Sequence, residues 1–150
     1  MQIDRAGLRV LTRDECLALL ATVQIGRIAV SARALPVIIP VRFAMDDDRI
    51  VIATHHGTTL DNATRDTVVA FEADGATGES PFGWSVHVNG IASHITDPTR
   101  LRRIAALQLP SWSTGQPTRF VAISTDHVEG RLVTGSDRPA ASPGTSLVGR

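Results

Sequence analysis

Apolar residues in this chain recur mainly at every second position, and this β-strand period constrains the fold more than any other feature of the sequence. Between Pro36 and Met45 every odd-numbered position is apolar, whereas Pro40 and Arg42 fall on the opposite face. About seven segments have strand character, at residues 25–31, 36–45, 50–52, 68–71, 83–96, 119–124 and 127–134. Helical segments are few and do not alternate with these strands, which excludes a doubly wound α/β sheet. We therefore expect a mainly β chain with short helices, folded as an antiparallel barrel or sandwich.

Two segments have helical periodicity instead. Thr12 and Glu15 match a capping box, and apolar residues at positions 16, 19, 20 and 23 then form one stripe, so a short helix is expected to follow Thr12 and to end near position 23. Cys16 lies on this stripe and is expected to be a small buried side chain rather than a reactive thiol. Asp97 and Pro98 begin the second helix, with proline at its first position.

Turn and loop residues divide the strands. The run Asp46-Asp47-Asp48 forms a polar turn, which makes a hairpin of the strands on either side of it. Residues 74–82 contain Gly, Ser and Pro and are expected to form an irregular loop, and Gly90 indicates a bulge or a close backbone approach. Residues 1–134 are expected to form one domain, and residues 135–150, rich in Ser, Pro and Gly, a flexible C-terminal tail.

Composition excludes several classes of protein. The 15 basic residues, all arginine, balance 15 acidic ones, so nothing indicates a nucleic-acid-binding protein. The absence of lysine and tyrosine excludes Schiff-base and catalytic-tyrosine mechanisms. A single cysteine cannot form an internal disulfide, and we expect a cytoplasmic location. No apolar run approaches the roughly 18 residues of a membrane span, and no basic-then-apolar leader opens the chain, so neither a membrane span nor a signal peptide is expected.

The loop from Thr54 to Leu60 is the segment most suggestive of ligand binding. Backbone amides around Gly57, the hydroxyls of Thr58 and Thr59, and a short helix predicted over residues 61–65 could cradle a phosphate. A helix cap with a glycine turn explains the same residues. The sequence alone leaves both interpretations open.

Other polar and aromatic side chains are equally open to two interpretations. Arg42 could clamp a phosphate, or it could be solvated or paired with a surface carboxylate. Trp84 is expected to pack in the core, but an indole could also cover a flat ring system. The 5 histidines lack the spacing of a metal-binding motif and no Gly-x-Ser-x-Gly elbow is present, so we expect neither a metal site nor a serine hydrolase.

Several short motifs, taken in order, carry a family resemblance. They are Glu15-Cys-Leu-Ala-Leu-Leu20, Gly26-Arg-Ile-Ala-Val30, Pro36-x-x-x-Pro40-Val-x-Phe43, Gly57-Thr-x-Leu60, Ala70-Phe-Glu72, Gly83-Trp-Ser-Val86 and Gly90 followed by Thr96-Asp-Pro98. Together they resemble the pyridoxamine 5′-phosphate oxidase-like family, and in particular its small actinobacterial branch of flavin-binding split barrels. The resemblance covers roughly residues 10–134.

This resemblance implies an antiparallel split β-barrel, a homodimer with two FMN sites at the subunit interface, and an FMN-dependent oxidoreductase acting on a small molecule. No catalytic residue is assigned, because the flavin would carry the redox chemistry. In such proteins one strand lies beside the isoalloxazine ring, the next loop receives the phosphate, and a tryptophan approaches the cofactor, from its own or the partner chain. The corresponding positions are Pro40, Val41, Arg42 and Phe43 for the strand, Thr54, Gly57, Thr58 and Thr59 for the loop, and Trp84.

Two positions depart from the family pattern. Thr59 stands where a lysine is common, and Arg42 stands where asparagine often follows Pro-Val. Loss of that ammonium removes a charge-assisted contact worth roughly 1.5–3 kcal/mol, and Arg42 is one candidate to restore the charge. Two alternatives to the FMN enzyme therefore remain, namely a barrel that binds a deazaflavin coenzyme or haem, and a non-catalytic small-molecule-binding dimer.

Overall fold

Eight strands and three short helices form along the part of the chain described by this computed structural model, which comprises residues 1–77, 80–109, 115 and 119–133. Their order is β1 (Arg9–Val10), α1 (Arg13–Leu20), β2 (Ile25–Ala32), β3 (Leu35–Asp46), β4 (Arg49–Thr54), α2 (Thr59–Asn62), β5 (Thr67–Thr77), β6 (Ser80–His94), α3 (Pro98–Ala105), β7 (Arg119–Ile123) and β8 (His127–Leu132). Within the described residues, no helix is both long and apolar enough to cross a membrane.

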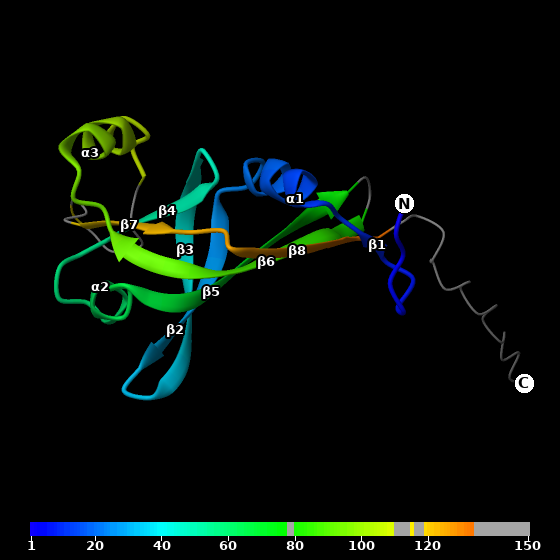
Figure 1. Ribbon diagram of the computed structural model, residues 1–150, viewed down its shortest axis with the longest axis horizontal. Coiled ribbons are helices and arrows are strands. Elements are labelled where there is room, and N and C mark those ends of the chain that lie inside the picture. Colours follow the sequence, from blue (N-terminus) through cyan, green and yellow to red (C-terminus); the bar gives the residue numbers. More distant parts are fainter. Residues whose placement is uncertain (78–79, 110–114, 116–118, 134–150) are drawn as a thin grey trace, which may run out of the picture.

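Strand β6 closes the sheet into a barrel because it pairs with three different strands. One edge of β6 pairs with β5, and its other edge pairs first with β8 and then, near His94, with β7. The order β6-β5-β2-β3-β4-β7 therefore returns to β6 as a six-stranded antiparallel barrel, while β8 and β1 extend the sheet from the other half of β6. Figure 1 shows β5 and β6 continuing out of the barrel toward β1. The antiparallel split-barrel prediction is confirmed.

Gly90 lies where β6 changes its partner from β8 to β7. A Cβ atom on Gly90 would stand 1.7 Å from the carbonyl oxygen of Ser124, in the connection between those two strands. Of the two alternatives given by the sequence, the close backbone approach is therefore correct. Only glycine lets the two strands diverge at this point without displacing the backbone of Ser124.

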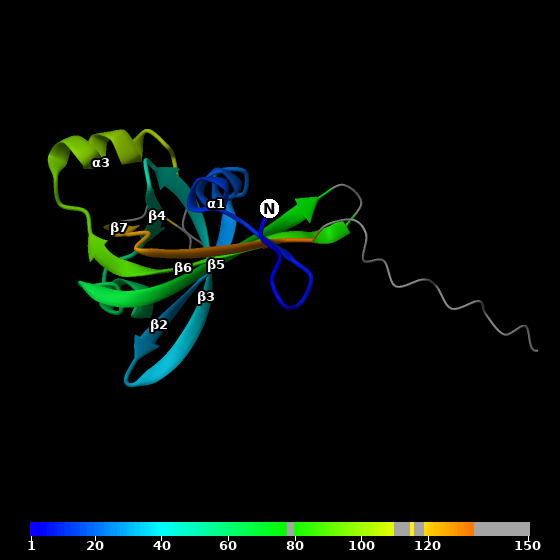
Figure 2. The ribbon, with the colours of Figure 1, turned by 45° about the vertical axis from the view of Figure 1, so that its right-hand side comes forward.

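Apolar side chains fill the barrel and a second layer outside it. The barrel core includes Phe43 and Phe71, whose rings meet edge to face with centroids 4.9 Å apart. Helix α3 covers the outer face of β4 and β7 with Ile104, which packs with Val51 and Ala122 (Figure 2). Because β4 is covered on both faces, its apolar run is continuous rather than alternating.

Helix α1 follows the sequence prediction closely. Thr12 caps it, and both hydrogen bonds of the capping box with Glu15 are present. Cys16 is fully buried as expected, and burial raises the pKa of its thiol. The helix ends at Leu20, a few residues earlier than the apolar stripe indicated.

Other element boundaries differ from the prediction. The irregular loop predicted over residues 74–82 is wrong for residues 74–77 and 80–82, because β5 runs to Thr77 and β6 begins at Ser80; residues 78 and 79 lie outside the described residues. Gly75 is needed for packing rather than for a turn, since a Cβ there would lie 2.6 Å from the indole of Trp84. The short helix begins at Thr59 instead of residue 61, and the short strand β1 was not predicted. The predicted tail over residues 135–150 lies outside the described residues.

Candidate functional site

The loop after β4 is held in shape by its own hydrogen bonds. Thr58 caps α2, accepting a hydrogen bond from the N–H of Asp61 at 3.1 Å and donating one to the carbonyl of His55 at 2.9 Å. The Thr54 hydroxyl lies 3.0 Å from that of Thr58, and Gly57 adopts a φ of 82°. The helix-cap interpretation is thus correct for Thr58. The first residue of α2, Thr59, leaves its side chain exposed.

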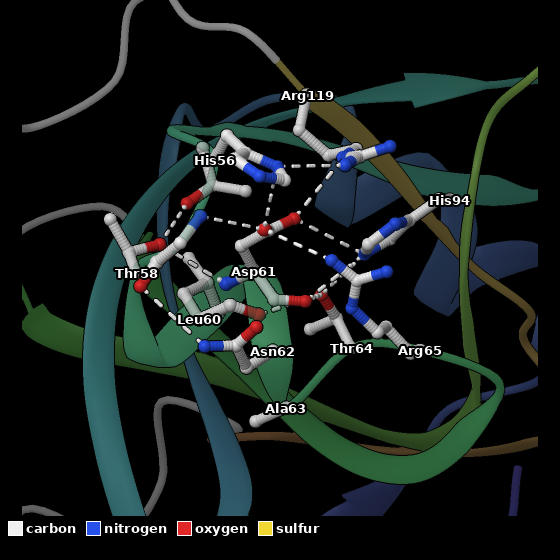
Figure 3. Close-up of polar contacts among 12 residues, drawn as sticks. His56, Thr58, Leu60, Asp61, Asn62, Ala63, Thr64, Arg65, His94 and Arg119 are labelled. Carbon is white, nitrogen blue, oxygen red and sulfur yellow. Dashed lines mark hydrogen bonds and ion pairs between the residues drawn. The ribbon is translucent and has the colours of Figure 1, made fainter.

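A buried carboxylate, that of Asp61, joins this loop to the neighbouring strands. Its Oδ2 accepts the N–H of Gly57 at 2.9 Å and lies 3.4 Å from the guanidinium of Arg65. Its Oδ1 accepts the Nε–H of Arg119 at 3.1 Å and lies 3.4 Å from Nε2 of His94. Figure 3 shows the side chains of Arg65, His94 and Arg119 pointing toward Asp61 from the segment that follows α2, from β6 and from β7. We call Asp61, Arg65, Arg119, His94 and His56, whose Nδ1 is 3.5 Å from Oδ2, the Asp61 cluster.

The charges of the Asp61 cluster are distributed unequally between interior and surface. The Asp61 side chain is 0% exposed, whereas the side chains of Arg119 and Arg65 are 26% and 49% exposed. Burial alone would raise the pKa of Asp61, but the Gly57 N–H and the charge of Arg119, aided by His94 and Arg65, hold that pKa below its ordinary value of 3.8. One buried carboxylate against two guanidiniums leaves a formal surplus of one positive charge, and that charge is at the surface.

Sequence reasoning did not identify the Asp61 cluster. The spacing of Asp61 and Arg65 is that of an ion pair on one helix face, which was a usable local signal. Arg119 and His94 could not be assigned, because they reach Asp61 only through the pairing of β4 with β7 and of β7 with β6. Such contacts between distant segments leave no trace in local periodicity.

A hollow lies on the outer surface beside β3. It has a volume of about 360 Å³ and is lined by Gln24, Arg42, Phe43, Ala44, Leu107, Gln108 and Leu109. Arg42 is exposed, as predicted, and makes no ion pair with the described residues. Pro40 also faces outward, whereas Val41 and Phe43 are buried in the barrel core.

The hollow and the loop are neighbours, and Trp84 lies apart from both. Phe43 pairs with Ile52, and Thr54 follows only two residues beyond Ile52 along β4. Trp84 and His94, by contrast, are ten positions apart on β6, a contour length of about 33 Å. Trp84 is buried at the half of β6 that pairs with β8. Within a single chain, the predicted strand and loop residues therefore lie close together, whereas Trp84 lies away from them.

The residues present fit a phosphorylated ring compound. Proteins bind phosphate with hydroxyl and guanidinium donors. The loop region offers the exposed hydroxyl of Thr59 and the partly exposed guanidiniums of Arg65 and Arg119, whereas the hydroxyl of Thr58 already donates to the carbonyl of His55. The hollow beside β3 has the size of a small-ligand site, about 300–1,000 Å³, and combines an apolar lining with the cation of Arg42. Among the described residues, no group of three or more His, Cys, Asp or Glu side chains could hold a metal ion.

Comparisons with known proteins find relatives of this chain in sequence and in fold. Residues 12–132 match the family model of pyridoxamine 5′-phosphate oxidase. The uncharacterized protein Rv0080 of Mycobacterium tuberculosis is 36% identical over 135 residues, which cover 86% of this chain and 88% of that protein. The FAD-binding protein from Mycobacterium smegmatis superposes with a TM-score of 0.68 at 28% identity, over 82% of this chain and 97% of that one. A conserved protein of unknown function from Corynebacterium diphtheriae, DIP1874, gives a TM-score of 0.68 at 27% identity, over 85% and 98% of the two chains.

Proposed function

This chain belongs to the pyridoxamine 5′-phosphate oxidase family, and from that premise we propose that it binds the flavin nucleotide FMN and serves as an FMN-dependent oxidoreductase for a small molecule. The observation that carries the proposal is the adjacency of two features. A hollow bordered by Arg42 and Phe43 lies next to a loop that offers hydroxyl and guanidinium donors. A ligand made of a ring system that carries a phosphate group needs both features, the hollow for the ring and the loop donors for the phosphate.

Each part of the cofactor has a defined place in this proposal. The outward face of β3, with Pro40 and Arg42 and the backbone at Val41 and Phe43, borders the isoalloxazine ring. The exposed hydroxyl of Thr59 donates to the phosphate, while Thr54, Gly57 and Thr58 hold the loop in shape through their hydrogen bonds with one another and with Asp61. When bound, the flavin supplies hydride and electron transfer. The protein itself supplies binding, orientation and a positive electrostatic environment.

We also propose a homodimer, formed through the outer face of β3, β2, β5 and β6. Ile38, Val68 and Ile91 lie on this face and are 71%, 72% and 50% exposed. They share it because Ala29 pairs with Ile38 and with Ala70, and Val68 pairs with Ile91. An exposed apolar surface of this kind is typical of a protein interface. Arg42 continues the same face of β3, so a partner seated there would border the hollow and could bring its own Trp84 to it.

The test is an absorbance spectrum of the purified protein, recorded before and after incubation with FMN and removal of free ligand by gel filtration. One retained flavin per chain would support the proposal, and the same measurement with FAD compares this chain with its mycobacterial relative. A deazaflavin or haem absorbance band in the purified protein would mean that one of those ligands, and not FMN, is the cofactor. A colourless protein that retains no flavin would reject the proposed function and leave a non-catalytic barrel.

A further inference from the structure

The loop from Thr54 to Leu60 contains neither lysine nor arginine, so a permanent positive charge beside it must come from another segment. Thr59 provides a neutral hydroxyl where a lysine is common, and the chain contains no lysine. Arg42 lines the hollow and contacts none of the described loop residues through a hydrogen bond or ion pair. Arg119 and Arg65, in contrast, are both tied to the loop through Asp61.

We propose that Arg119, positioned by the buried carboxylate of Asp61, is the principal cation that binds the phosphate of the cofactor. This inference rests on the proposed flavin function. It assigns phosphate recognition to Arg119 and a positioning role to Asp61, and the loop motif contains neither residue. Its ligand chemistry is a phosphate attached to a bulky organic group.

Strand pairing places Arg119 at the loop. Arg119 is the direct cross-strand partner of Thr54, the last residue of β4 before the loop. Its Nε–H donates to Asp61 at 3.1 Å, and its NH2 group lies 3.1 Å from Nδ1 of His56, inside the loop. A guanidinium carries five N–H donors, so these two contacts leave three of them for a ligand, among the partners that the structure describes.

Asp61 acts on a ligand only through the groups that it holds. Its side chain is fully buried, so a ligand at the surface meets the partly exposed guanidinium and not the carboxylate. The same carboxylate accepts the Gly57 N–H, and its own backbone N–H donates to Thr58. Asp61 thus fixes the spacing between Arg119 and the loop hydroxyls, which makes it a positioning residue. Arg65 is a weaker candidate, because its single contact with Asp61 is longer, at 3.4 Å, and its side chain is more exposed.

The experiment compares the affinities for FMN, FAD and riboflavin, because riboflavin has the same ring but no phosphate. In Arg119→Leu the dissociation constant for FMN should rise roughly ten- to a hundredfold, while that for riboflavin stays within a few-fold of wild type. Arg119→Lys should retain most of the FMN affinity. Asp61→Asn should lower the FMN-to-riboflavin affinity ratio less than Arg119→Leu does, since the guanidinium is still present. Arg13→Leu is the matched control, because it removes the same charge from an arginine in α1 that pairs with Asp48.

A compensating substitution makes the test specific to charge. Thr59→Lys, which restores the common family residue, should recover FMN affinity when it is added to Arg119→Leu. The inference is overturned if Arg119→Leu binds FMN as wild type does, or if it loses FMN and riboflavin affinity in equal proportion. A wild-type protein that binds none of the three flavins rejects the proposed function itself, and the inference with it.

Discussion

At the scale of single residues, Asp61 combines complete burial with a negative charge, a combination that is costly unless the charge is compensated. Compensation comes from the Gly57 N–H, from Arg119 and Arg65, and from the imidazoles of His94 and His56. These interactions favour the ionised form, so the pKa of Asp61 in the folded protein lies below its ordinary value. A carboxyl group of this kind stabilises the fold above its unfolded-state pKa, and that stability is lost as the pH falls through the folded-state pKa.

Asp61→Asn should therefore change how stability depends on pH. At neutral pH the variant should be less stable than wild type by about 1–3 kcal/mol, because hydrogen bonds to a charged acceptor are replaced by weaker ones. The difference should begin to shrink as the pH falls below 3.8, the ordinary value for Asp61, where the unfolded chain is protonated at this site, and it should disappear as the pH falls through the lower pKa of the folded protein. Urea unfolding curves of both proteins, measured from neutral pH downward, check this. A difference that stays constant across the range would contradict the assignment.

At the scale of secondary-structure elements, β6 closes the barrel because it pairs with β5 on one edge and with β8 and then β7 on the other. Gly90 lies where the partner changes from β8 to β7 and permits the close approach of Ser124 at that point. Gly90→Ala places a Cβ atom 1.7 Å from the Ser124 carbonyl oxygen, and this oxygen belongs to the backbone, which cannot turn aside as a side chain can. We expect a loss of at least about 3 kcal/mol, at the upper end of overpacking effects, or a failure to fold. Gly57→Ala is the control, because Gly57 has a positive φ but a Cβ atom there would meet no other atom within 4 Å. It should cost only about 1–2 kcal/mol, and equal losses in thermal unfolding would contradict this explanation of Gly90.

The elements also show how far the sequence determines the structure. Alternation predicts β3 and β6 and places Trp84, Val86 and Val88 on the buried face, because one side of each strand packs against the barrel core. Local turn signals fail between residues 74 and 82, where Gly75 makes room for an indole across the hairpin. For the site, the loop threonines were identifiable from local motifs. Arg119 was not, because its place beside Thr54 depends on a pairing between segments 65 residues apart.

At the scale of the whole molecule, the proposed dimer and the proposed cofactor site depend on one another. Arg42 and Pro40 alternate with the barrel-facing Val41 and so share the outer face of β3 with Ile38. A partner that covers Ile38 would therefore also border the hollow beside Arg42. With 15 basic and 15 acidic residues the chain has no formal net charge, so no long-range repulsion opposes the association of two copies.

Charged substitutions on the apolar face should therefore remove two properties at once. Ile38→Asp combined with Val68→Asp buries two carboxylates in the proposed interface, so we expect a monomer in sedimentation experiments and at least a tenfold weaker affinity for FMN. Both side chains are more than 70% exposed, so the fold itself should change in stability by less than about 0.5 kcal/mol per substitution. Ile3→Asp is the control, because Ile3 is 45% exposed but lies outside this sheet face. If the double variant remains dimeric, the interface lies elsewhere. If it is monomeric yet binds FMN normally, the flavin site is complete within one chain. In that case no residue of the partner, Trp84 included, contributes to the site.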